Sequence, residues 1–291
     1  MKILLTGGSG FIGKNLREQL SKKYDLVAPF HRELDLLDET AVRSFLEAEK
    51  FDVVIHAANY GGKRTQTDLV GVFETNKRMF FNLANNQHLF GRMIFLGSGA
   101  EYGKQRPIVK VKETDFGKVR PQDEYGQSKY LASEYIAEHN RIVNLRLFGV
   151  YGKYEDYKTR FISNAICRAL YGLPIVIRQN VRFDFLYVND LINIIEYFIN
   201  TEAKEKFYNT GTGHPVDLEK LAVMVKEIVD VTEIIVKNPG LGREYTCDNG
   251  LLVKELGNFS FTPPEVAIKE MVLWYKENLQ QIKREDLEFD R

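Results

Sequence analysis

The chain has 291 residues, 44% of them hydrophobic, and its 40 basic residues balance 40 acidic ones to a formal net charge of +0. This length is ample for a sizeable core, and the neutral charge gives no reason to expect a nucleic-acid or membrane-surface partner. No apolar segment approaches the ~20 residues of a membrane span. Two isolated cysteines, Cys167 and Cys247, are typical of reduced core residues, so we expect a soluble, cytoplasmic protein. We predict no metal site.

The first two-thirds of the chain alternate between strands and helices. Short apolar runs predict strands at 2–6, 25–30, 51–58, 92–98 and 141–148. Apolar residues at helical spacing predict the intervening helices at 11–23, 39–50, 68–86 and 124–140. Strict alternation implies right-handed crossovers, and therefore an α/β fold with a Rossmann-type, doubly wound parallel sheet.

After residue 151, strands and helices no longer alternate strictly. Helices are predicted at 160–172, 189–200 and 217–229, and a last one begins at Pro263–Pro264 and runs to about residue 278. Short apolar pieces lie between them, and no repeat or low-complexity linker separates them from the first part. We therefore predict a smaller, mixed α/β C-terminal lobe packed against the sheet.

A glycine run, TGGSGFIG, follows the first strand and opens the first helix. Gly7 permits a tight turn, Gly10 lets the backbone approach a pyrophosphate, and Gly13 lets the helix pack closely on the strand. Phe11 and Ile12 lie between them, at the positive end of the helix. A plain strand–helix turn is the alternative, but this position in an alternating pattern favours binding of a dinucleotide cofactor.

A YxxxK pair, Tyr125 and Lys129, begins the helix that follows the fourth strand, and Ser98 ends that strand. One helical turn places Tyr125 and Lys129 on one face. The lysine ammonium is expected to lower the phenol pKa from ~10, so that Tyr125 exchanges a proton with a carbonyl or carbinol oxygen while Ser98 hydrogen-bonds that oxygen. Tyrosine and lysine are common, and only the ordered combination with the glycine loop makes the pattern specific.

The chain resembles the extended short-chain dehydrogenase/reductases, in the branch of nucleotide-sugar epimerases, dehydratases and reductases. Besides the motifs above, the resemblance rests on DVVIHAA, LGSGAEYG, LRLFGVYG, FDFLYVNDL, YNTGTG and IKEMVLWYKEN, and it extends to about residue 276. It implies an NAD(P)-binding domain at 1–150, with a return segment at about 184–201. Residues 151–183 and 202–291 would form the substrate-binding lobe.

The resemblance also assigns roles to residues. Ser98, Tyr125 and Lys129 would be the catalytic set, and Lys129 would hold the nicotinamide ribose as well. Ala57 and Ala58 would line the cofactor. Asn76 would help order the cofactor site, with a buried hydrogen bond from helix to loop as the alternative. Many relatives are homodimers, which implies a homodimer here.

The end of the second strand bears on the choice of cofactor. LVAPFHRELDLLD resembles the corresponding segment of GDP-fucose synthases, which are NADPH-dependent. An acid commonly binds the adenosine ribose of NAD at this point, whereas His31 and Arg32 stand here and suit a ribose 2′-phosphate. Asp35 and Leu36 would flank the adenine. A solvated turn is the alternative for Arg32; NADP(H) is favoured and NAD is possible.

Departures from the family pattern exclude some reactions. Family dehydratases carry an Asp-Glu pair directly after the strand-end serine or threonine, but Gly99 and Ala100 stand here. GDP-fucose synthases use a cysteine and a histidine for epimerisation, at positions where this chain has Ala100 and Arg160. We therefore predict hydride transfer without inversion of a neighbouring carbon. If a base does act, Tyr151, Lys153 and Tyr157 are the first to test.

The substrate implied by the resemblance is a nucleotide diphospho-sugar. Two positions that bind its diphosphate in the family differ in this chain. Gly149 replaces an asparagine that commonly touches the diphosphate, and Arg182 lies three residues before Phe185, where the family spacing is two. Arg160, Arg182 and Arg243 are the predicted diphosphate ligands.

Three functions remain open from the sequence. The first is NADPH-dependent reduction of a nucleotide-activated 4-keto-deoxy sugar. The second is an NAD-dependent 4-epimerase that uses the same catalytic set. The third is a non-catalytic NADP-sensing protein, against which the intact Ser98, Tyr125 and Lys129 argue.

Overall fold

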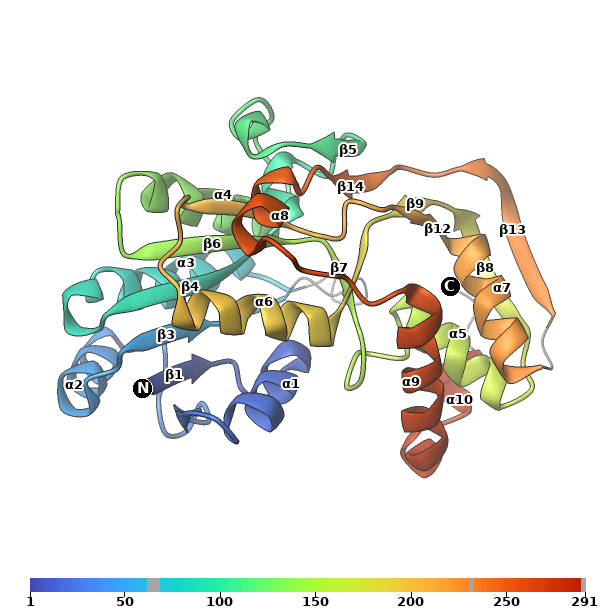
Figure 1. Cartoon of the computed structure of the whole chain (residues 1–291), viewed down its shortest axis with the longest axis horizontal. Helices are drawn as coiled ribbons and strands as arrows, with labels where there is room; N and C mark the ends of the chain where they lie inside the picture. The colour runs from blue at the N-terminus through green and yellow to red at the C-terminus, as the bar shows by residue number, and fades with distance from the viewer. Residues whose placement is uncertain (62–68, 231–232, 289–291) are drawn as a thin grey trace.

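A six-stranded parallel sheet forms the centre of the larger lobe (Figure 1) in the computed structural model, which describes residues 1–61, 69–230 and 233–288. The strand order is β2 (Asp25–Val27), β1 (Lys2–Thr6), β3 (Val53–His56), β4 (Arg92–Ser98), β6 (Ile142–Leu147) and β11 (Phe207–Thr210), and every neighbouring pair is parallel. The direction of winding reverses between β1 and β3, so the loops after these strands open a crevice at their carboxyl ends. The predicted doubly wound fold is confirmed.

Both faces of the sheet are covered by helices, because successive side chains of a strand point to opposite faces. Ile3 and Leu5 of β1 pack into one core, while Leu4 between them packs into the other. The first core is closed by α1 (Phe11–Leu20) and α6 (Val188–Asn200); the second is closed by α2 (Glu39–Glu49), α3 (Val72–Ala84) and α4 (Glu124–Ala137). Apolar residues on both faces explain why the strands read as continuous apolar runs.

Several element boundaries differ from the prediction by a few residues, and two differences change the description of the sheet. Strand β2 ends at Val27 rather than Phe30, because the chain turns there: the carbonyl oxygen of Phe30 accepts the N–H groups of Glu33 and Leu34. Strand β11, which the predicted division at residue 202 places in the smaller lobe, pairs with β6 at the edge of the main sheet. A four-residue edge strand carries too little pattern to reveal its neighbour.

The smaller lobe lies on the right in Figure 1 and is built from three short sheets and a group of helices. A mixed sheet has the order β12 (Val216–Asp217), β9 (Arg182–Phe183), β14 (Tyr245–Cys247) and β5 (Ile108–Val111). The parallel pairs are β13 (Ile234–Leu241) with β8 (Ile175–Asn180), and β10 (Phe185–Tyr187) with β7 (Gly149–Tyr151). The helices of this lobe are α5 (Phe161–Leu170), α7 (Leu218–Val229), α9 (Pro264–Glu277) and α10 (Glu285–Glu288), whereas α8 (Gly250–Leu256) contacts β11 at the edge of the main sheet. The 3-10 turns of the chain are η1 (Gln87–Leu89), η2 (Gly99–Tyr102), η3 (Glu113–Asp115) and η4 (Leu279–Gln281).

The two lobes share one hydrophobic core. The core that covers α1 and α6 continues without a break into buried residues of α5, α7 and α9. Strand β5 comes from the first half of the chain but pairs with β14 in the smaller lobe, which ties the lobes together a second time. The smaller lobe is therefore held in place against the carboxyl ends of the main strands.

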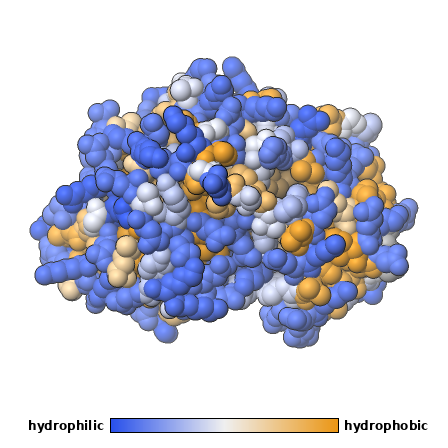
Figure 2. All heavy atoms as spheres, in the orientation of Figure 1, coloured by the Kyte–Doolittle hydropathy of each residue, from blue (hydrophilic) through white to orange (hydrophobic). Residues whose placement is uncertain are grey.

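The outer surface in the view of Figure 2 is mainly hydrophilic, with apolar side chains gathered over the smaller lobe. Exposed apolar residues of that lobe include Val223, Val266 and Leu273. Both cysteines are buried and free, as predicted. Among the helices of the described residues, none is long and apolar enough to cross a bilayer.

Candidate active site

The glycine loop forms one wall of a cavity of about 940 Å³ at the carboxyl ends of β1, β3 and β4. Gly7 has φ +71°, and a Cβ on it would lie 2.6 Å from the Ala58 nitrogen; a Cβ on Gly13 would lie 2.0 Å from the Gly7 oxygen. Gly10 begins α1 without a side-chain cap, so the first N–H groups of the helix stay free for an anion. Gly7, Gly10, Phe11, Ile12 and Gly13 all line the cavity, as expected of a dinucleotide cradle.

Two arginines lie near the end of β2: Arg32 from the segment after this strand, which the sequence analysis identified, and Arg17 from α1. His31, Asp35 and Leu36 line the cavity, whereas Arg32 is not among the described residues that line it. The Arg32 guanidinium lies over the Phe30 ring at 5.7 Å, and Arg17 from α1 lies over the same ring at 5.3 Å. Two guanidinium groups thus flank the Phe30 ring, and neither arginine is among the described residues that line the cavity.

Arg17 was missed by the sequence analysis. Its side chain passes close to Gly8, where a Cβ would lie only 2.9 Å from Arg17 Cδ. The spacing of Gly13 and Arg17 could have predicted this position. Residues four apart share one face of a helix, so Arg17 lies on the same face of α1 as Gly13, which packs against Gly7 and Gly8. The exposed carboxylate next to Arg32, that of Glu33, is used within the turn itself, because it accepts the Phe30 N–H at 2.8 Å.

The wall after β3 is held by hydrogen bonds from neighbouring elements. Ala57 and Ala58 line the cavity, and the Ala58 N–H donates to Thr6 Oγ1 at 3.3 Å. Asn76 does not line the cavity, contrary to the predicted cofactor contact, because its amide is used elsewhere. It accepts the Tyr60 N–H and donates to the Tyr60 oxygen, both at 2.8 Å. Asn76 therefore orders the loop after β3, which is the alternative role.

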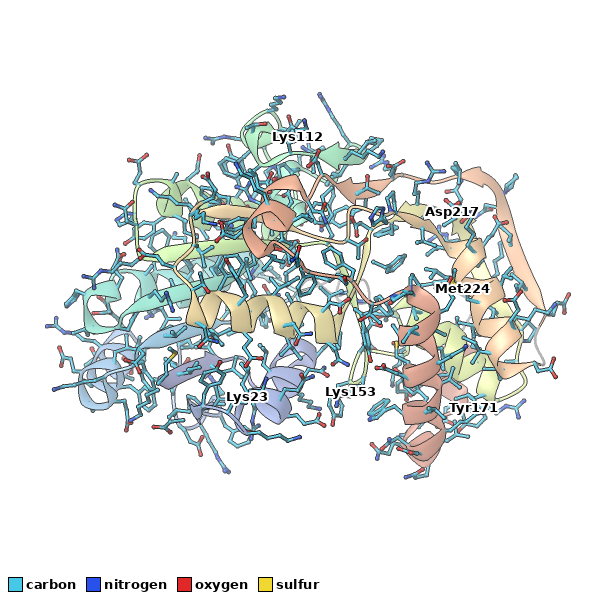
Figure 3. The ribbon with its side chains drawn as sticks, in the orientation of Figure 1. Lys23, Lys112, Lys153, Tyr171, Asp217 and Met224 are labelled. Atoms are coloured by element: carbon cyan, nitrogen blue, oxygen red, sulfur yellow. The ribbon has the colours of Figure 1, made fainter. Side chains whose placement is uncertain are left out.

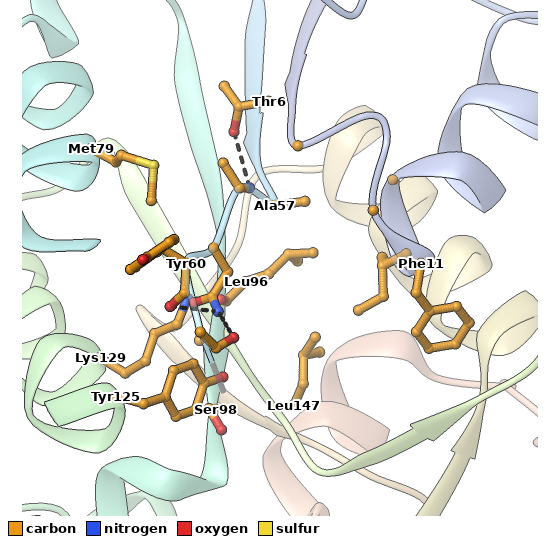
Figure 4. A pocket seen from close by; sticks show the side chains of 18 of the residues that line it. Thr6, Phe11, Ala57, Tyr60, Met79, Leu96, Ser98, Tyr125, Lys129 and Leu147 are labelled. Carbon is orange, nitrogen blue, oxygen red and sulfur yellow. Dashed lines mark hydrogen bonds between the residues drawn. The ribbon is translucent and has the colours of Figure 1, made fainter. Parts of the chain in front are cut away.

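Ser98, Tyr125 and Lys129 converge on the cavity from β4 and α4 (Figure 4). Asp123 caps α4 by accepting the Gly126 N–H at 2.9 Å, which starts the helix at the right residue to present Tyr125 and Lys129 together. The Lys129 ammonium lies 5.9 Å from the Tyr125 ring centroid and donates to the Leu96 oxygen at 2.8 Å. The predicted catalytic set thus shares one wall of the cavity.

The protonation of this set differs from the expectation. Burial raises the pKa of Tyr125, and hydrogen bonding to Ser98 and the charge of Arg160 oppose this only in part. Burial also lowers the pKa of Lys129 to about 8. The expected lowering of the phenol pKa by Lys129 is therefore not found, because desolvation outweighs the effect of an ammonium that is bonded to a backbone oxygen.

A buried polar network supports Ser98 from below. Glu101 Oε1 accepts the Ser98 N–H at 3.0 Å, and Glu101 Oε2 accepts Arg146 Nε at 2.7 Å and the Ser133 hydroxyl at 2.5 Å. Glu101 and Arg146 are almost completely excluded from solvent. A Cβ on Gly97 would lie 2.5 Å from Glu101 Oε1, which explains the glycine before the catalytic serine.

The predicted diphosphate ligands do not all reach the cavity. Arg160 lines it, but Arg182 and Arg243 are not among the lining residues that the structure describes. Arg182 pairs with Asp217 at 3.4 Å, and Arg243 donates to the Gln105 oxygen at 3.2 Å. Gly149 leaves no room for the usual asparagine, because its Cβ would lie 2.7 Å from the Asp184 oxygen.

Two residues missed from the sequence complete the substrate side. Lys104 follows η2 and lies over the Tyr125 ring at 5.3 Å. Tyr245 reaches the same cavity from β14. Lys104 comes two residues after Tyr102, so its closeness to Ser98 in the sequence could have predicted that it reaches the cavity. No local pattern around Tyr245 predicts this.

The three residues proposed as alternative bases are engaged elsewhere, and none is among the described residues that line the cavity. Lys153 lies between α1 and the smaller lobe (Figure 3) and pairs with Glu18 at 2.7 Å. Tyr157 donates to Asp286 at 2.9 Å, and burial raises the pKa of Tyr151 far above its ordinary range.

The comparisons with known proteins agree on one family. The model of the NAD dependent epimerase/dehydratase family matches residues 3–211. GDP-L-colitose synthase of Yersinia pseudotuberculosis is 26% identical over 283 residues, covering 88% of this chain and 92% of the relative. GDP-mannoheptose C4 reductase from Campylobacter jejuni, solved with NADP bound, superposes with a TM-score of 0.82 at 21% identity, covering 94% of this chain and 98% of that chain. UDP-glucose 4-epimerase from Thermotoga maritima, solved with UDP-glucose, gives a TM-score of 0.82 at 22% identity, covering 96% and 100%.

Proposed function

Because the chain belongs to the NAD dependent epimerase/dehydratase family, whose enzymes modify nucleotide sugars, we propose that it is an NADPH-dependent reductase of a nucleotide-activated 4-keto-deoxy sugar. One observation carries the proposal: Ser98, Tyr125 and Lys129 meet on the wall of a cavity whose opposite side is an uncapped glycine loop. A hydride donor and a carbonyl fit side by side in such a cavity.

The cavity suits a dinucleotide. A Cβ on Gly7 or Gly13 would collide with backbone atoms of the loop wall, and the free N–H groups at the start of α1 suit a pyrophosphate. In the proposed complex, Lys129 holds the nicotinamide ribose, and Asp35 and Leu36 flank the adenine; all three residues line the cavity. When bound, the reduced nicotinamide supplies a hydride to a carbonyl carbon.

Tyr125 is the proposed general acid of the reduction. A phenol with a raised pKa is protonated at neutral pH, which is the form that gives a proton to a carbonyl oxygen as it becomes an alkoxide. Ser98 donates a hydrogen bond to the same oxygen and stabilises its developing charge. Lys129 helps to keep positive charge near the phenol after the proton has left.

The cations at the end of β2 support NADPH over NADH. Arg17 and Arg32 both lie against Phe30, and a planar guanidinium binds a phosphate with two parallel hydrogen bonds. Two carboxylates of this segment bind their own backbone: Glu33 accepts the Phe30 N–H, and Asp35, which lines the cavity, accepts the Leu37 N–H. A ribose 2′-phosphate is therefore a better match for this end of the crevice than two ribose hydroxyls.

The charges near the catalytic end support an anionic substrate. Lys104 and Arg160 line that end of the cavity, and both suit a diphosphate. Among the described lining residues, the one carboxylate and the one histidine, Asp35 and His31, lie at the adenosine end. This favours simple reduction over a reaction that removes a proton beside the ketone.

Turnover with defined substrates tests the proposal. Thermal shift with GDP, CDP, UDP and dTDP selects the base, and oxidation of NADPH is then followed with the corresponding nucleotide 4-keto-6-deoxy sugars. We expect NADPH oxidation that depends on both enzyme and sugar. NAD that co-purifies with the protein, together with interconversion of two sugars without added cofactor, would assign the 4-epimerase instead. Binding of NADP without turnover of any sugar would assign the non-catalytic alternative.

A further inference from the structure

The two residues of β9, Arg182 and Phe183, have side chains on opposite sides of the strand, because successive side chains of a strand alternate. Arg182 is half-exposed and pairs with Asp217 at 3.4 Å, whereas Phe183 lines the cavity. Phe183 stands two residues before Phe185, where the family spacing places an arginine. Moving the arginine by one residue has therefore turned it away from the cavity and put an aromatic ring in its place.

Phe183 belongs to a row of three aromatic rings, Phe148, Tyr245 and Phe183, which we call the aromatic wall. All three residues line the cavity. The Tyr245 ring lies in the middle, with its centroid 5.0 Å from that of Phe148 and 5.5 Å from that of Phe183. Tyr245 of β14 is aligned with Phe183 of β9, so the pairing of these strands holds the two rings side by side.

The Phe148 end of the aromatic wall lies beside the proposed catalytic serine. A Cβ on Gly99, the residue after Ser98, would lie 2.8 Å from the Phe148 ring and 2.6 Å from Tyr245 Oη. In the proposed reaction Ser98 binds the oxygen of the carbonyl that is reduced. The part of the substrate that meets these rings is therefore next to the reacting carbon. In a nucleotide sugar this part is the hexose, because the diphosphate separates it from the nucleobase.

The aromatic wall has few hydrogen-bonding groups for a sugar hydroxyl. Two of its side chains are phenylalanines, and its one polar side-chain atom, Tyr245 Oη, lies at the Gly99 end. The neighbouring carboxylate, Asp184, is completely buried, and its two oxygens accept the N–H groups of Thr212 and Gly213. A hydroxyl placed against the rings would lose its water without gaining a partner, whereas a methyl group would gain apolar contact.

We propose that the aromatic wall, and Phe183 in particular, selects a 6-deoxy hexose: the rings pack against the methyl group on C5, the neighbour of the reacting C4, and disfavour a 6-hydroxyl. This assignment rests on the proposed nucleotide-sugar substrate and names the sugar carbon that the site distinguishes. Binding of the diphosphate is then left to Lys104 and Arg160, the cations that line the catalytic end of the same cavity.

The first test measures binding without turnover. The full-length protein is saturated with NADPH (or with NADH, if that is the cofactor that binds), which cannot reduce a sugar that already carries a 4-hydroxyl. Titration calorimetry then compares the glucose and mannose forms of GDP, UDP, CDP and dTDP with their 6-deoxy counterparts. With the preferred base, the 6-deoxy form should bind about 5- to 50-fold more tightly, because a buried hydroxyl without a partner is costly. Equal or weaker binding of the 6-deoxy forms, or no binding of either form, overturns the proposal.

The second test asks whether Phe183 causes the preference. Phe183→Asn gives the 6-hydroxyl a partner and should reduce the preference to less than about threefold, whereas Phe183→Leu stays apolar and should retain most of it. Phe185→Leu is the matched control: its ring lies 5.6 Å from that of Phe183, but Phe185 is not among the described residues that line the cavity. If Phe183→Asn fails to fold, the smaller Phe183→Thr takes its place. A full preference in the folded polar variant, or its loss in Phe185→Leu alone, overturns the proposal.

Two further measurements separate this selection from other roles of the cavity. If the rings stacked on the nucleobase, Phe183→Asn would weaken binding of the free nucleoside diphosphate as much as that of the nucleotide sugar, and the proposal would fail; we expect less than about a twofold change for the free diphosphate. If the 6-deoxy preference is found but no 4-keto sugar is reduced, the reductase assignment fails and the selection stands. Equally fast reduction of 6-deoxy and 6-hydroxy 4-keto sugars would instead overturn the selection and leave the reductase assignment intact.

Discussion

Arg146 Nε donates to Glu101 Oε2 at 2.7 Å, and this buried pair lies directly below the Ser98 backbone, whose N–H is bound by the same carboxylate at 3.0 Å. The pair joins η2 to β6, two segments 45 residues apart. Ser98, the proposed catalytic serine, is therefore held by a charge pair that solvent does not reach.

Removing one partner of this pair should be costly. Glu101→Ala leaves the Arg146 charge buried without a partner, and we expect the free energy of unfolding to fall by about 3–5 kcal/mol. Urea denaturation measures the loss. Arg120→Ala, which breaks an exposed pair with Glu134, should leave the midpoint unchanged within error. A Glu101→Ala variant as stable as the parent would mean that the pair does not support the fold.

Cofactor choice should depend on the two arginines that flank the Phe30 ring, Arg17 and Arg32. Arg17→Ala and Arg32→Ala should each weaken NADPH binding by about 1.5–3 kcal/mol, the scale of a charge-assisted hydrogen bond, and leave NADH binding nearly unchanged. Titration calorimetry with both cofactors measures this. Arg178→Ala, an exposed arginine of β8, is the control. Equal losses for NADPH and NADH would exclude recognition of the 2′-phosphate.

Proton transfer should depend on Tyr125. Tyr125→Phe keeps the ring and the helix but removes the hydroxyl, so turnover should fall by roughly 10²–10⁴-fold while the cofactor still binds. Lys129→Met should impair both turnover and cofactor affinity, because the ammonium serves two partners. Steady-state kinetics and cofactor titration separate the two effects. Activity of the Phe variant equal to that of the parent would assign the acid to another residue.

The stereochemical outcome should be reduction alone. In deuterated water, the product should carry no solvent deuterium on the carbons beside the reduced one, because the described catalytic end of the cavity offers no carboxylate or histidine base. Deuteride from 4-deuterated NADPH should appear only at the reduced carbon. Mass spectrometry and NMR of the product locate the label. Enzyme-dependent exchange at a neighbouring carbon would identify an additional epimerase step.

Stability should fall between about pH 4.5 and pH 8 because of Glu155. Burial raises the pKa of this carboxyl from 4.5 to about 8, so in this range the folded protein holds a proton that the unfolded chain has released. Folding is therefore favoured less as the pH rises. Glu155→Gln, which keeps a polar partner for Ser163, should match the parent near pH 4.5 and exceed its stability by a few kcal/mol near pH 8. Parallel pH profiles for the two proteins would contradict this.

Local sequence patterns were sufficient for the sheet and the first half of the site. Gly13 is required by its contact with Gly7 inside one strand–helix unit, so the spacing of the glycine run predicts its role, whereas Gly7 lies against Ala57 and Ala58 after β3, a contact that only the folded sheet creates. Tyr125 and Lys129 are one helical turn apart, and their common face follows from the helix geometry. The alternating strands predict which side chains enter which core, because the period of a strand is two residues.

Contacts between distant segments decided the rest. Arg182 and Arg243 were predicted by family spacing, but Arg182 pairs with Asp217, and Arg243 binds the backbone near Lys104. Tyr245 reaches the cavity only because β14 pairs with β5, and Arg17 of α1 lies over the Phe30 ring only in the folded chain. The pKa of Tyr125 depends on desolvation, a property of all the groups around it. Periodicity fixes what a segment of chain does by itself, whereas pairing partners, burial and charge depend on which segments the folded chain brings together.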